Sequence, residues 1–248
     1  MEALDWLVAR PVAHRGLHDA QKGIIENTPS AFEAAIAGNY GIECDLQVAA
    51  DGEAMVHHDD ALGRLTEGSE RLDAMTTSDL KRIAFKATAD RMITLGELCD
   101  LVAGRTPLVI ELKSRFDRDR RLVGRAADVL SGYRGAAAVM SFDPGQIAAL
   151  REIAPRLPRG VVAERSTRHG ERDRLPAATR RGMAFFEHAL RSRPQFIAYS
   201  IRDLPAALPM LARNLFRLPL LTWTVRSADD RNKAERFADQ MIFEGFRP

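Results

Sequence analysis

Cysteine is scarce in this sequence, and long apolar runs are absent. The 248 residues contain two cysteines, Cys44 and Cys99, too few for a disulfide framework. No stretch approaches the roughly 20 apolar residues that a membrane span needs, and the amino terminus has no run of signal-peptide length. These absences exclude a disulfide-stapled miniprotein and predict a soluble, cytoplasmic protein without stable membrane insertion.

The sequence also lacks a strong charge of either sign. Lys and Arg number 36 against 34 Asp and Glu, so the formal net charge is only +2. This balance argues against a nucleic-acid partner, because nucleic-acid binding usually requires a strongly basic surface. No Gly/Ser-rich or Pro-rich linker interrupts the chain, so we expect a single domain over residues 1–248, of unknown oligomeric state.

Short apolar runs recur along the chain, with helix-like segments between them. Strands are expected at 11–16, 41–48, 107–113, 136–142, 160–164, 196–201, 218–225 and 240–244, and helices at 28–38, 94–103, 120–130, 144–153, 177–189, 204–213 and 228–238. In the first helix, Thr28 is expected to cap the amino end and Pro29 suits the first position. Eight alternations of strand and helix in this length indicate an α/β protein with a (β/α)₈ TIM barrel. An open doubly wound sheet is the alternative.

One feature interrupts the alternation. After the second strand, Asp51-Gly52 predicts a tight turn into a short strand at 54–58, which makes a hairpin. We expect this small insertion to extend the second strand above the barrel rim. Residues 62–89 are then a loop and helix that return to the outer ring.

Polar residues gather where the predicted strands end, and barrel active sites lie at that end. Side chains two apart on a strand share a face, so Glu43 lies beside Asp45, and Glu111 beside Lys113, while Cys44 faces the helices. The first strand ends in His14-Arg15-Gly16 and the hairpin in His57-His58-Asp59.

Three carboxylates inside a barrel need compensating positive charge. One possibility is that Arg15 and Lys113 are simply their salt-bridge partners. The other is a hard divalent cation, Mg²⁺ or Ca²⁺, because an oxygen-only ligand set suits these ions. With the metal and both basic residues present, the site keeps a single net positive charge, which favours a singly charged phosphodiester as substrate.

The ordered set of motifs resembles the glycerophosphodiester phosphodiesterase family, a group of phospholipase C-like TIM-barrel enzymes. The motifs, in chain order, are His14-Arg15-Gly16, Glu26-Asn27-Thr28, Glu43-x-Asp45, Asp51-Gly52 before His58-Asp59, Glu111-x-Lys113, Ser141-Phe142-Asp143-Pro144, the segment 155–160 and Trp223-Thr224-Val225. The resemblance implies a metal-dependent hydrolase that converts a glycerophosphodiester and water to glycerol 3-phosphate and an alcohol. Its only implied partner is this small substrate.

The same resemblance assigns residues to roles. It implies a metal bound by Glu43, Asp45 and Glu111, catalytic histidines at His14 and His58, and phosphate contacts from Arg15 and Lys113. It selects His58 over His57, because in the family the second histidine directly precedes an aspartate. Neither the acid and base roles nor the choice between direct water attack and a cyclic phosphate follows from the sequence.

Other positions keep two interpretations. Glu26 and Asn27 either contact substrate or only support the loop before the first helix. Trp223 either forms an apolar wall for the substrate or belongs to the core. His18, His169 and His188 match no motif and are expected to be structural or exposed. The family's last strand commonly ends in Thr-Asp, where this chain has Phe243-Glu244, so Glu244 is the candidate replacement for that aspartate.

Three rival functions remain. The same site suits a phospholipase D-like or sugar-phosphodiester hydrolase. A metallohydrolase of amides or lactones is disfavoured, because such barrels select histidine-rich ligation. A non-catalytic phosphoester-binding barrel ranks last, since none of the expected catalytic residues is lost.

Overall fold

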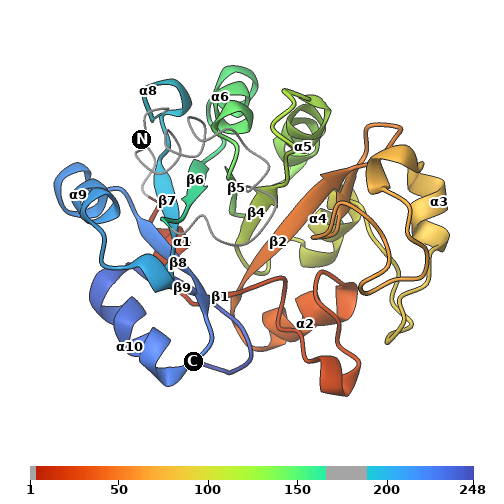
Figure 1. The fold of residues 1–248 in the computed structure, drawn as a ribbon, viewed down its shortest axis with the longest axis horizontal. Helices are drawn as coiled ribbons and strands as arrows, with labels where there is room; N and C mark the ends of the chain where they lie inside the picture. The colour runs from red at the N-terminus through yellow and green to blue at the C-terminus, as the bar shows by residue number, and fades with distance from the viewer. Residues whose placement is uncertain (1–3, 166–188) are drawn as a thin grey trace.

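The computed structural model describes residues 4–165 and 189–248, and its centre is a closed barrel (Figure 1). Strand β1 pairs in parallel with both β2 and β9, which closes the sheet and excludes the open doubly wound alternative. The eight parallel strands are β1 Val12–Ala13, β2 Gly41–Val48, β4 Leu108–Leu112, β5 Ala137–Ser141, β6 Arg159–Ala163, β7 Phe196–Ser200, β8 Leu220–Val225 and β9 Gln240–Phe243. The predicted (β/α)₈ barrel is therefore confirmed.

The helices lie around the strands, except for α1 Asp5–Val8, which packs against the interior cluster of the barrel (Figure 1). The others are α2 Pro29–Ala37, α3 Thr77–Arg82, α4 Leu95–Val102, α5 Arg121–Gly132, α6 Pro144–Ile153, α8 Ala189–Ser192, α9 Ala207–Phe216 and α10 Ala228–Phe237, with 3₁₀ turns η1 Ala20–Lys22, η2 Leu72–Ala74 and η4 Ile201–Asp203. The helix expected at 177–189 lies almost entirely outside the described residues. Within the described ranges, no helix has both the length and the apolar character needed to cross a membrane.

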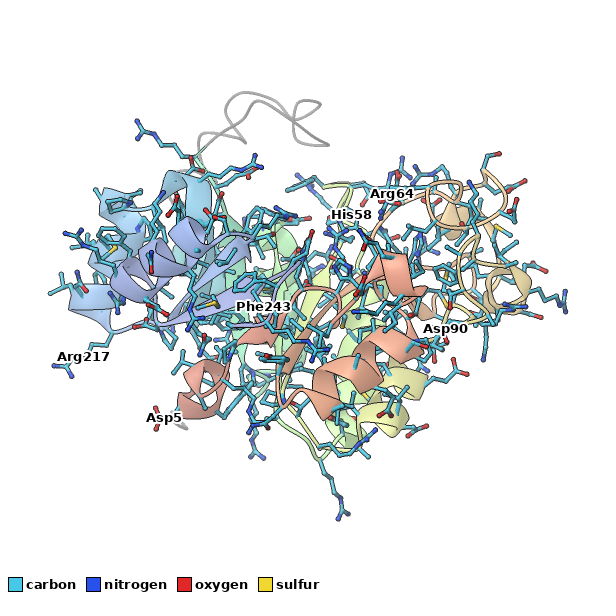
Figure 2. The ribbon with its side chains drawn as sticks, turned by 90° about the horizontal axis from the view of Figure 1, so that it is seen from below. Asp5, His58, Arg64, Asp90, Arg217 and Phe243 are labelled. Carbon is cyan, nitrogen blue, oxygen red and sulfur yellow. The ribbon has the colours of Figure 1, made fainter. Side chains whose placement is uncertain are left out.

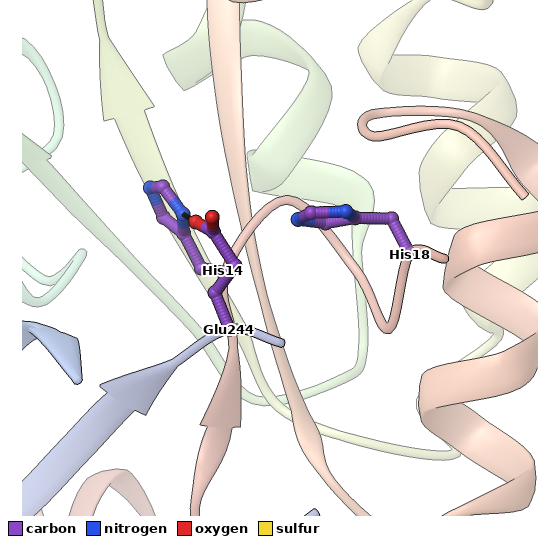
Figure 3. Close-up of side chains that lie close together, drawn as sticks. All are labelled: His14, His18 and Glu244. Atoms are coloured by element: carbon purple, nitrogen blue, oxygen red, sulfur yellow. Dashed lines mark hydrogen bonds and ion pairs between the residues drawn. The ribbon is translucent and has the colours of Figure 1, made fainter. Parts of the chain in front are cut away.

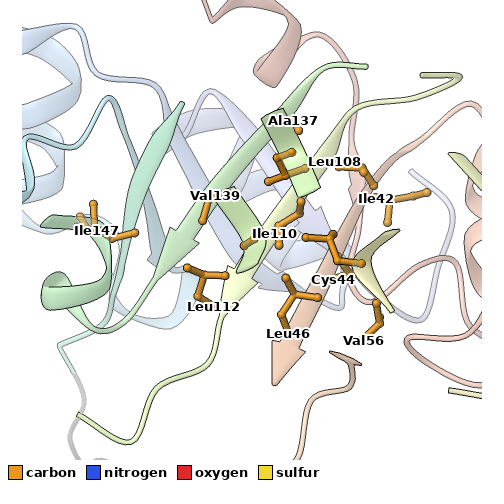
Figure 4. Close-up of a cluster of buried hydrophobic side chains, with 14 of the residues drawn as sticks. Ile42, Cys44, Leu46, Val56, Leu108, Ile110, Leu112, Ala137, Val139 and Ile147 are labelled. Carbon is orange, nitrogen blue, oxygen red and sulfur yellow. The ribbon is translucent and has the colours of Figure 1, made fainter. Parts of the chain in front are cut away.

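Alternation along each strand divides the apolar side chains into two layers. Val109 and Ala138 point into the barrel, where Leu7 of α1 packs beneath them. Cys44, Leu46 and their neighbours pack outward against the helices (Figure 4), as the sequence predicts for Cys44. The same alternation turns Glu43, Asp45 and Glu111 toward the barrel interior.

The insertion after β2 builds a small core of its own beside the barrel. Strand β3 Ala54–Val56 pairs antiparallel with β2, which confirms the predicted hairpin. Met55 packs in a buried cluster with Leu62, Leu80, Phe85 and others from the following loop and α3. Burying each such side chain contributes about 1.5–3 kcal/mol, so this cluster fixes the hairpin and the loop above the rim.

The amino end of α2 differs in one detail from the prediction. Thr28 occupies the N-cap position, but its hydroxyl donates a hydrogen bond to the Ile25 carbonyl (2.8 Å) instead of accepting one from the helix. This bond braces the loop that carries Glu26 and Asn27, so Thr28 helps to position two predicted site residues.

Candidate active site

A cavity of about 230 Å³ opens at the carboxyl ends of the barrel strands. Figure 2 shows His58 and the neighbouring Arg64 at the end of the molecule opposite Asp5 and Arg217. The residues that line it include His14, Arg15, Glu43, His58, Glu111, Lys113, Phe142, Trp223 and Arg226.

Three acidic side chains form one cluster inside the barrel. Asp45 on β2 lies opposite Glu111 on β4, and Glu43 lies one alternation earlier on β2. One carboxylate oxygen from each lies within 4.8 Å of the others. Asp45 and Glu43 are each 1% exposed and Glu111 is 6% exposed, so their charges require partners within the protein.

Two basic residues supply part of that compensation. Lys113 Nζ lies 2.8 Å from Asp45 Oδ1 and 2.7 Å from Glu111 Oε1, and Arg15 Nε lies 3.2 Å from Asp45 Oδ2. Burial alone would raise the pKa of Asp45, but Lys113 and Arg15 outweigh it and hold that pKa well below its usual range. Burial would likewise lower the pKa of Lys113, yet the two carboxylates raise it above normal. Asp45 is ionised and Lys113 is protonated.

Glu43 is the carboxylate that these cations do not neutralise. Burial, together with the charges of Asp45 and Glu111, raises the pKa of Glu43 well above its usual value. The cluster thus has a place for one more cation, which would replace the proton on Glu43. Three converging carboxylate oxygens suit Mg²⁺ or Ca²⁺, so the residues fit the metal that the sequence predicts.

The turn after β1 brings the backbone of Arg15 to this cluster. Arg15 adopts a positive φ of 56°, and its amide donates to Glu43 Oε2 at 2.9 Å. The next residue, Gly16, has φ of +80°, and a Cβ there would lie 2.8 Å from the backbone of Ala31 in α2. Only glycine fits, which explains why the turn reads His-Arg-Gly.

Glu26 and Asn27 support the site from behind. Asn27 is 1% exposed and bonds Asp45 in both directions, with its Nδ2 donating to Oδ2 (2.9 Å) and its Oδ1 accepting from the Asp45 amide (3.3 Å). Glu26 Oε1 accepts from Arg15 (2.7 Å). Neither residue lines the cavity, so their positions favour support of Asp45 and Arg15 over the substrate contact that the sequence analysis considers.

His14 is held by a carboxylate from the far end of the chain. Its amide donates to the Phe243 carbonyl, and its Nδ1 lies 2.7 Å from Glu244 Oε2 (Figure 3). Arg226 donates to both oxygens of Glu244, at 3.1 Å each. Burial lowers the pKa of His14 more than Glu244 raises it, so the ring is neutral near pH 7. Glu244 therefore orients the His14 ring through Nδ1.

His58 has a similar arrangement. Its Nδ1 lies 2.8 Å from Asp59 Oδ1, and Arg64 Nε donates to Asp59 Oδ2 at 2.6 Å. Arg64 also donates to both oxygens of Glu26, at 2.7 and 3.2 Å. Burial would raise the pKa of Glu26, but Arg64 and Arg15 lower it to about 2. Arg64 thus connects Asp59, which bonds His58, to Glu26, which bonds Arg15.

His57 lies outside this arrangement. It is 2% exposed, does not line the cavity, and its ring meets the edge of Phe85 at 6.4 Å between centroids. Burial lowers its pKa to about 4. The structure places His58, the residue selected from the sequence, at the cavity.

Phe142 and Trp223 form the apolar side of the cavity. Their rings meet edge to face, with centroids 5.4 Å apart. Trp223 belongs to β8 and is only partly buried, so it lies at the cavity surface and not in the closed core. The indole Nε1 is buried without a hydrogen-bond partner among the described residues.

Sequence reasoning missed two arginines, Arg64 and Arg226, and gave no role to Asp59. Asp59 carried a signal, because it directly follows His58 in the motif. Arg64 lies in a charged segment that reads as a solvated loop, and Arg226 follows the Trp223 motif without any pattern of its own. Their ion pairs become visible only when the loops are placed in space.

Residues 14–244 match the family model described as the glycerophosphoryl diester phosphodiesterase family. A glycerophosphodiester phosphodiesterase from Caldanaerobacter subterraneus is 29% identical over 161 residues, which cover 61% of this chain and 65% of that protein. A probable glycerophosphodiester phosphodiesterase 1 from Mycobacterium tuberculosis is 30% identical over 172 residues, 59% of this chain and 61% of that protein. The matched region thus spans less than two thirds of either relative.

Solved structures share the fold. An Oleispira antarctica phosphodiesterase in complex with the product sn-glycerol-3-phosphate superposes with a TM-score of 0.77 at 17% identity, covering 97% of this chain and 95% of that one. A putative glycerophosphoryl diester phosphodiesterase from Silicibacter pomeroyi gives 0.74 at 23% identity, covering 94% and 89%. The family model spans nearly the whole described barrel and includes His14 and Glu244 at its two ends. The chain belongs to the glycerophosphoryl diester phosphodiesterase family.

Proposed function

We propose that this protein hydrolyses glycerophosphodiesters to glycerol 3-phosphate and an alcohol, with a divalent metal and two histidines. The observation that carries the proposal is the meeting of three buried carboxylates, two basic side chains and two carboxylate-bound histidines around one cavity. Family membership and the Oleispira relative with bound sn-glycerol-3-phosphate support the same substrate class.

The substrate phosphate meets positive charge on arrival. Glu43, Asp45 and Glu111 would hold Mg²⁺ or Ca²⁺, which when bound supplies Lewis-acid stabilisation of the charge on phosphoryl oxygens. Arg15 and Lys113 line the same cavity and contribute fixed cations. Because this charge grows in the transition state, preorganised cations there lower the barrier.

Each of the two histidines transfers a proton through its Nε2, one as a base and the other as an acid. Each ring turns Nδ1 toward a carboxylate, Glu244 for His14 and Asp59 for His58, which leaves Nε2 for the substrate side. We assign the base to His14, whose lowered pKa keeps it unprotonated near pH 7. We assign the acid to His58, which gives its proton to the departing alcohol oxygen.

The apolar side of the cavity suits the carbon chain of glycerol. Phe142 and Trp223 offer ring surface, while the charged residues lie on the other wall. A phospholipase D-like or sugar-phosphodiester activity would use the same charged wall with a different group against the rings. Substrate profiling separates these activities.

The direct experiment is product identification with metal-stripped and metal-restored protein. A coupled assay for glycerol 3-phosphate, run on glycerophosphocholine and glycerophosphoethanolamine, should show activity that disappears on chelation and returns with Mg²⁺ or Ca²⁺. Glu43→Gln should weaken metal binding and activity, while Glu235→Gln, the same change on the exposed face of α10, should do neither. Full activity in verified metal-free protein would reject the proposal. Cleavage of only lysophospholipids or sugar phosphodiesters would favour the alternatives.

A further inference from the structure

We propose a second metal site, made by His14, His18 and Glu244, that takes a transition ion of the Zn²⁺ type and switches the enzyme off. One potential ligand atom from each of these residues lies within 4.8 Å of the other two. Figure 3 shows the His18 ring reaching from the loop after β1 toward the pair formed by His14 and Glu244. No part of the proposed phosphodiesterase chemistry uses His18.

His18 brings an unsatisfied nitrogen to this place. Its Nε2 is buried, and among residues 4–165 and 189–248 it has no hydrogen-bond partner. Buried polar atoms are almost always paired, so an exception beside two other potential ligands calls for a chemical explanation. A bound cation would satisfy Nε2 where the protein does not.

The donor set selects a different ion from the carboxylate cluster. Two imidazoles and one carboxylate are the ligands of three-residue zinc sites, in which solvent completes the coordination. Mg²⁺ and Ca²⁺ prefer oxygen ligands and bind imidazole poorly. The barrel thus offers an all-oxygen site for Mg²⁺ or Ca²⁺. A second site, which includes His14 and has both nitrogen and oxygen ligands, suits Zn²⁺ or Co²⁺.

Occupancy of the second site conflicts with catalysis. His14 Nδ1 and Glu244 Oε2 are 2.7 Å apart and share a proton. A metal that binds both displaces this proton from Nδ1, and the neutral ring then carries it on Nε2. His14 then has no free ring nitrogen to accept a proton, so bound metal inhibits the proposed hydrolysis.

Arg226 sets the strength of the site. Its guanidinium donates to both Glu244 oxygens at 3.1 Å and places a positive charge beside the metal position. This charge opposes metal binding. Removing it with Arg226→Gln should tighten the site, whereas His18→Gln should weaken it.

The binding test does not depend on activity. Co²⁺ is titrated into metal-stripped protein with excess Mg²⁺ present to occupy the carboxylate cluster, and the visible absorption of the bound ion is followed. We expect a saturable band in the wild type and an affinity loss of at least about 10-fold in His18→Ala and His18→Gln. Glu43→Gln and His57→Gln should keep the band, since they change the other site or a residue outside both. Equal Co²⁺ affinity in wild type and both His18 variants would overturn the proposal.

The inhibition test rests on the proposed function and is read separately. With saturating Mg²⁺ and glycerophosphocholine, micromolar Zn²⁺ should inhibit the wild type, while His18→Gln should keep the basal rate and lose this sensitivity. Identical inhibition of both proteins would mean that Zn²⁺ acts at the carboxylate cluster, which would overturn the inhibitory role. If no substrate is cleaved at all, the proposed function fails, and the Co²⁺ titration still decides whether the site exists.

Discussion

The two halves of the cavity hold their histidines by the same device but with different connections. On one side stand His14, Glu244 and Arg226, and on the other His58, Asp59 and Arg64. Each histidine binds a carboxylate, and each carboxylate binds an arginine.

The two halves differ in the further partners of their arginines. Among the described residues, the Arg226 side chain pairs with Glu244, whereas Arg64 continues through Glu26 to Arg15, one of the two phosphate-binding candidates. Burial also differs, since the side chain of His14 is 12% exposed and that of His58 is 29% exposed. Under the proposed function, we therefore expect the first half to act on one proton transfer and the second to link proton transfer to substrate charge.

The largest expected effects come from the histidines themselves. His14→Ala and His58→Ala should each lower kcat by roughly 10²- to 10⁴-fold, because each loses a general acid or base. His57→Ala should retain turnover per folded molecule, since His57 is buried away from the cavity. Steady-state kinetics with the three variants make the comparison, and an inactive His57→Ala beside an active His58→Ala would reverse the assignment.

Arg15→Lys tests whether the second half acts on phosphate charge. The substitution keeps the charge but loses the planar fork that can hold two oxygens at once, so we expect a loss of about 10²-fold in kcat/KM. Lys113→Met should cause a loss of similar size, in kcat as well as KM. Near-normal kinetics in both variants would mean that these cations serve only as salt-bridge partners of the carboxylates.

The two arginines behind the carboxylates should separate the halves. Arg64→Gln should raise KM and lower kcat, together about 10-fold, because it loosens both Asp59 and Glu26. Arg226→Gln should act mainly on the pH profile, through Glu244. It frees Glu244 to interact more fully with His14, which raises the pKa of His14 and moves the acidic limb of the pH profile upward.

Matched controls exist for both arginines. Arg71→Gln breaks ion pairs with Asp60 and Asp73 in the same insertion as Arg64, and Arg231→Gln breaks a pair with Glu235 on α10. Neither control should alter the kinetics. Indistinguishable profiles for Arg64→Gln and Arg226→Gln would remove the difference between the halves.

The smallest effect concerns stability and not activity. Burial lowers the pKa of His57 from 6.5 to about 4. Between these values the unfolded chain binds a proton that the folded chain does not, so the free energy of unfolding falls as pH falls, by about 3 kcal/mol for this group. Thermal unfolding of His57→Gln should therefore depend less steeply on pH between 6.5 and 4 than that of the wild type. Parallel curves would contradict this origin of the acid sensitivity.

The fold was largely predictable from the sequence, because each buried strand is a short apolar run bounded by polar residues. The position of the carboxylates was predictable for the same reason, since side chains two apart on a strand share a face. His58 was separable from His57 only through the family motif.

The connections between side chains were not predictable. Glu244 reaches His14 across 230 positions of the sequence, and Arg64 reaches Glu26 across 38. The partner of a long arginine side chain depends on which loops lie near it in the folded protein. The spacing of residues along the sequence does not give that information. The partner of the Thr28 hydroxyl was unpredictable for the same reason, because it bonds the Ile25 carbonyl of the neighbouring loop and not the helix.

In the proposed mechanism, one histidine takes a proton and the other gives one. The most direct measurement compares kcat/KM of His14→Ala and His58→Ala on glycerophosphocholine and on a glycerol p-nitrophenyl phosphodiester, whose leaving group departs without a proton. We predict that the activated ester restores most of the lost activity in His58→Ala and little of it in His14→Ala. Equal defects of the two variants on both substrates, or rescue of His14→Ala instead, would contradict the account.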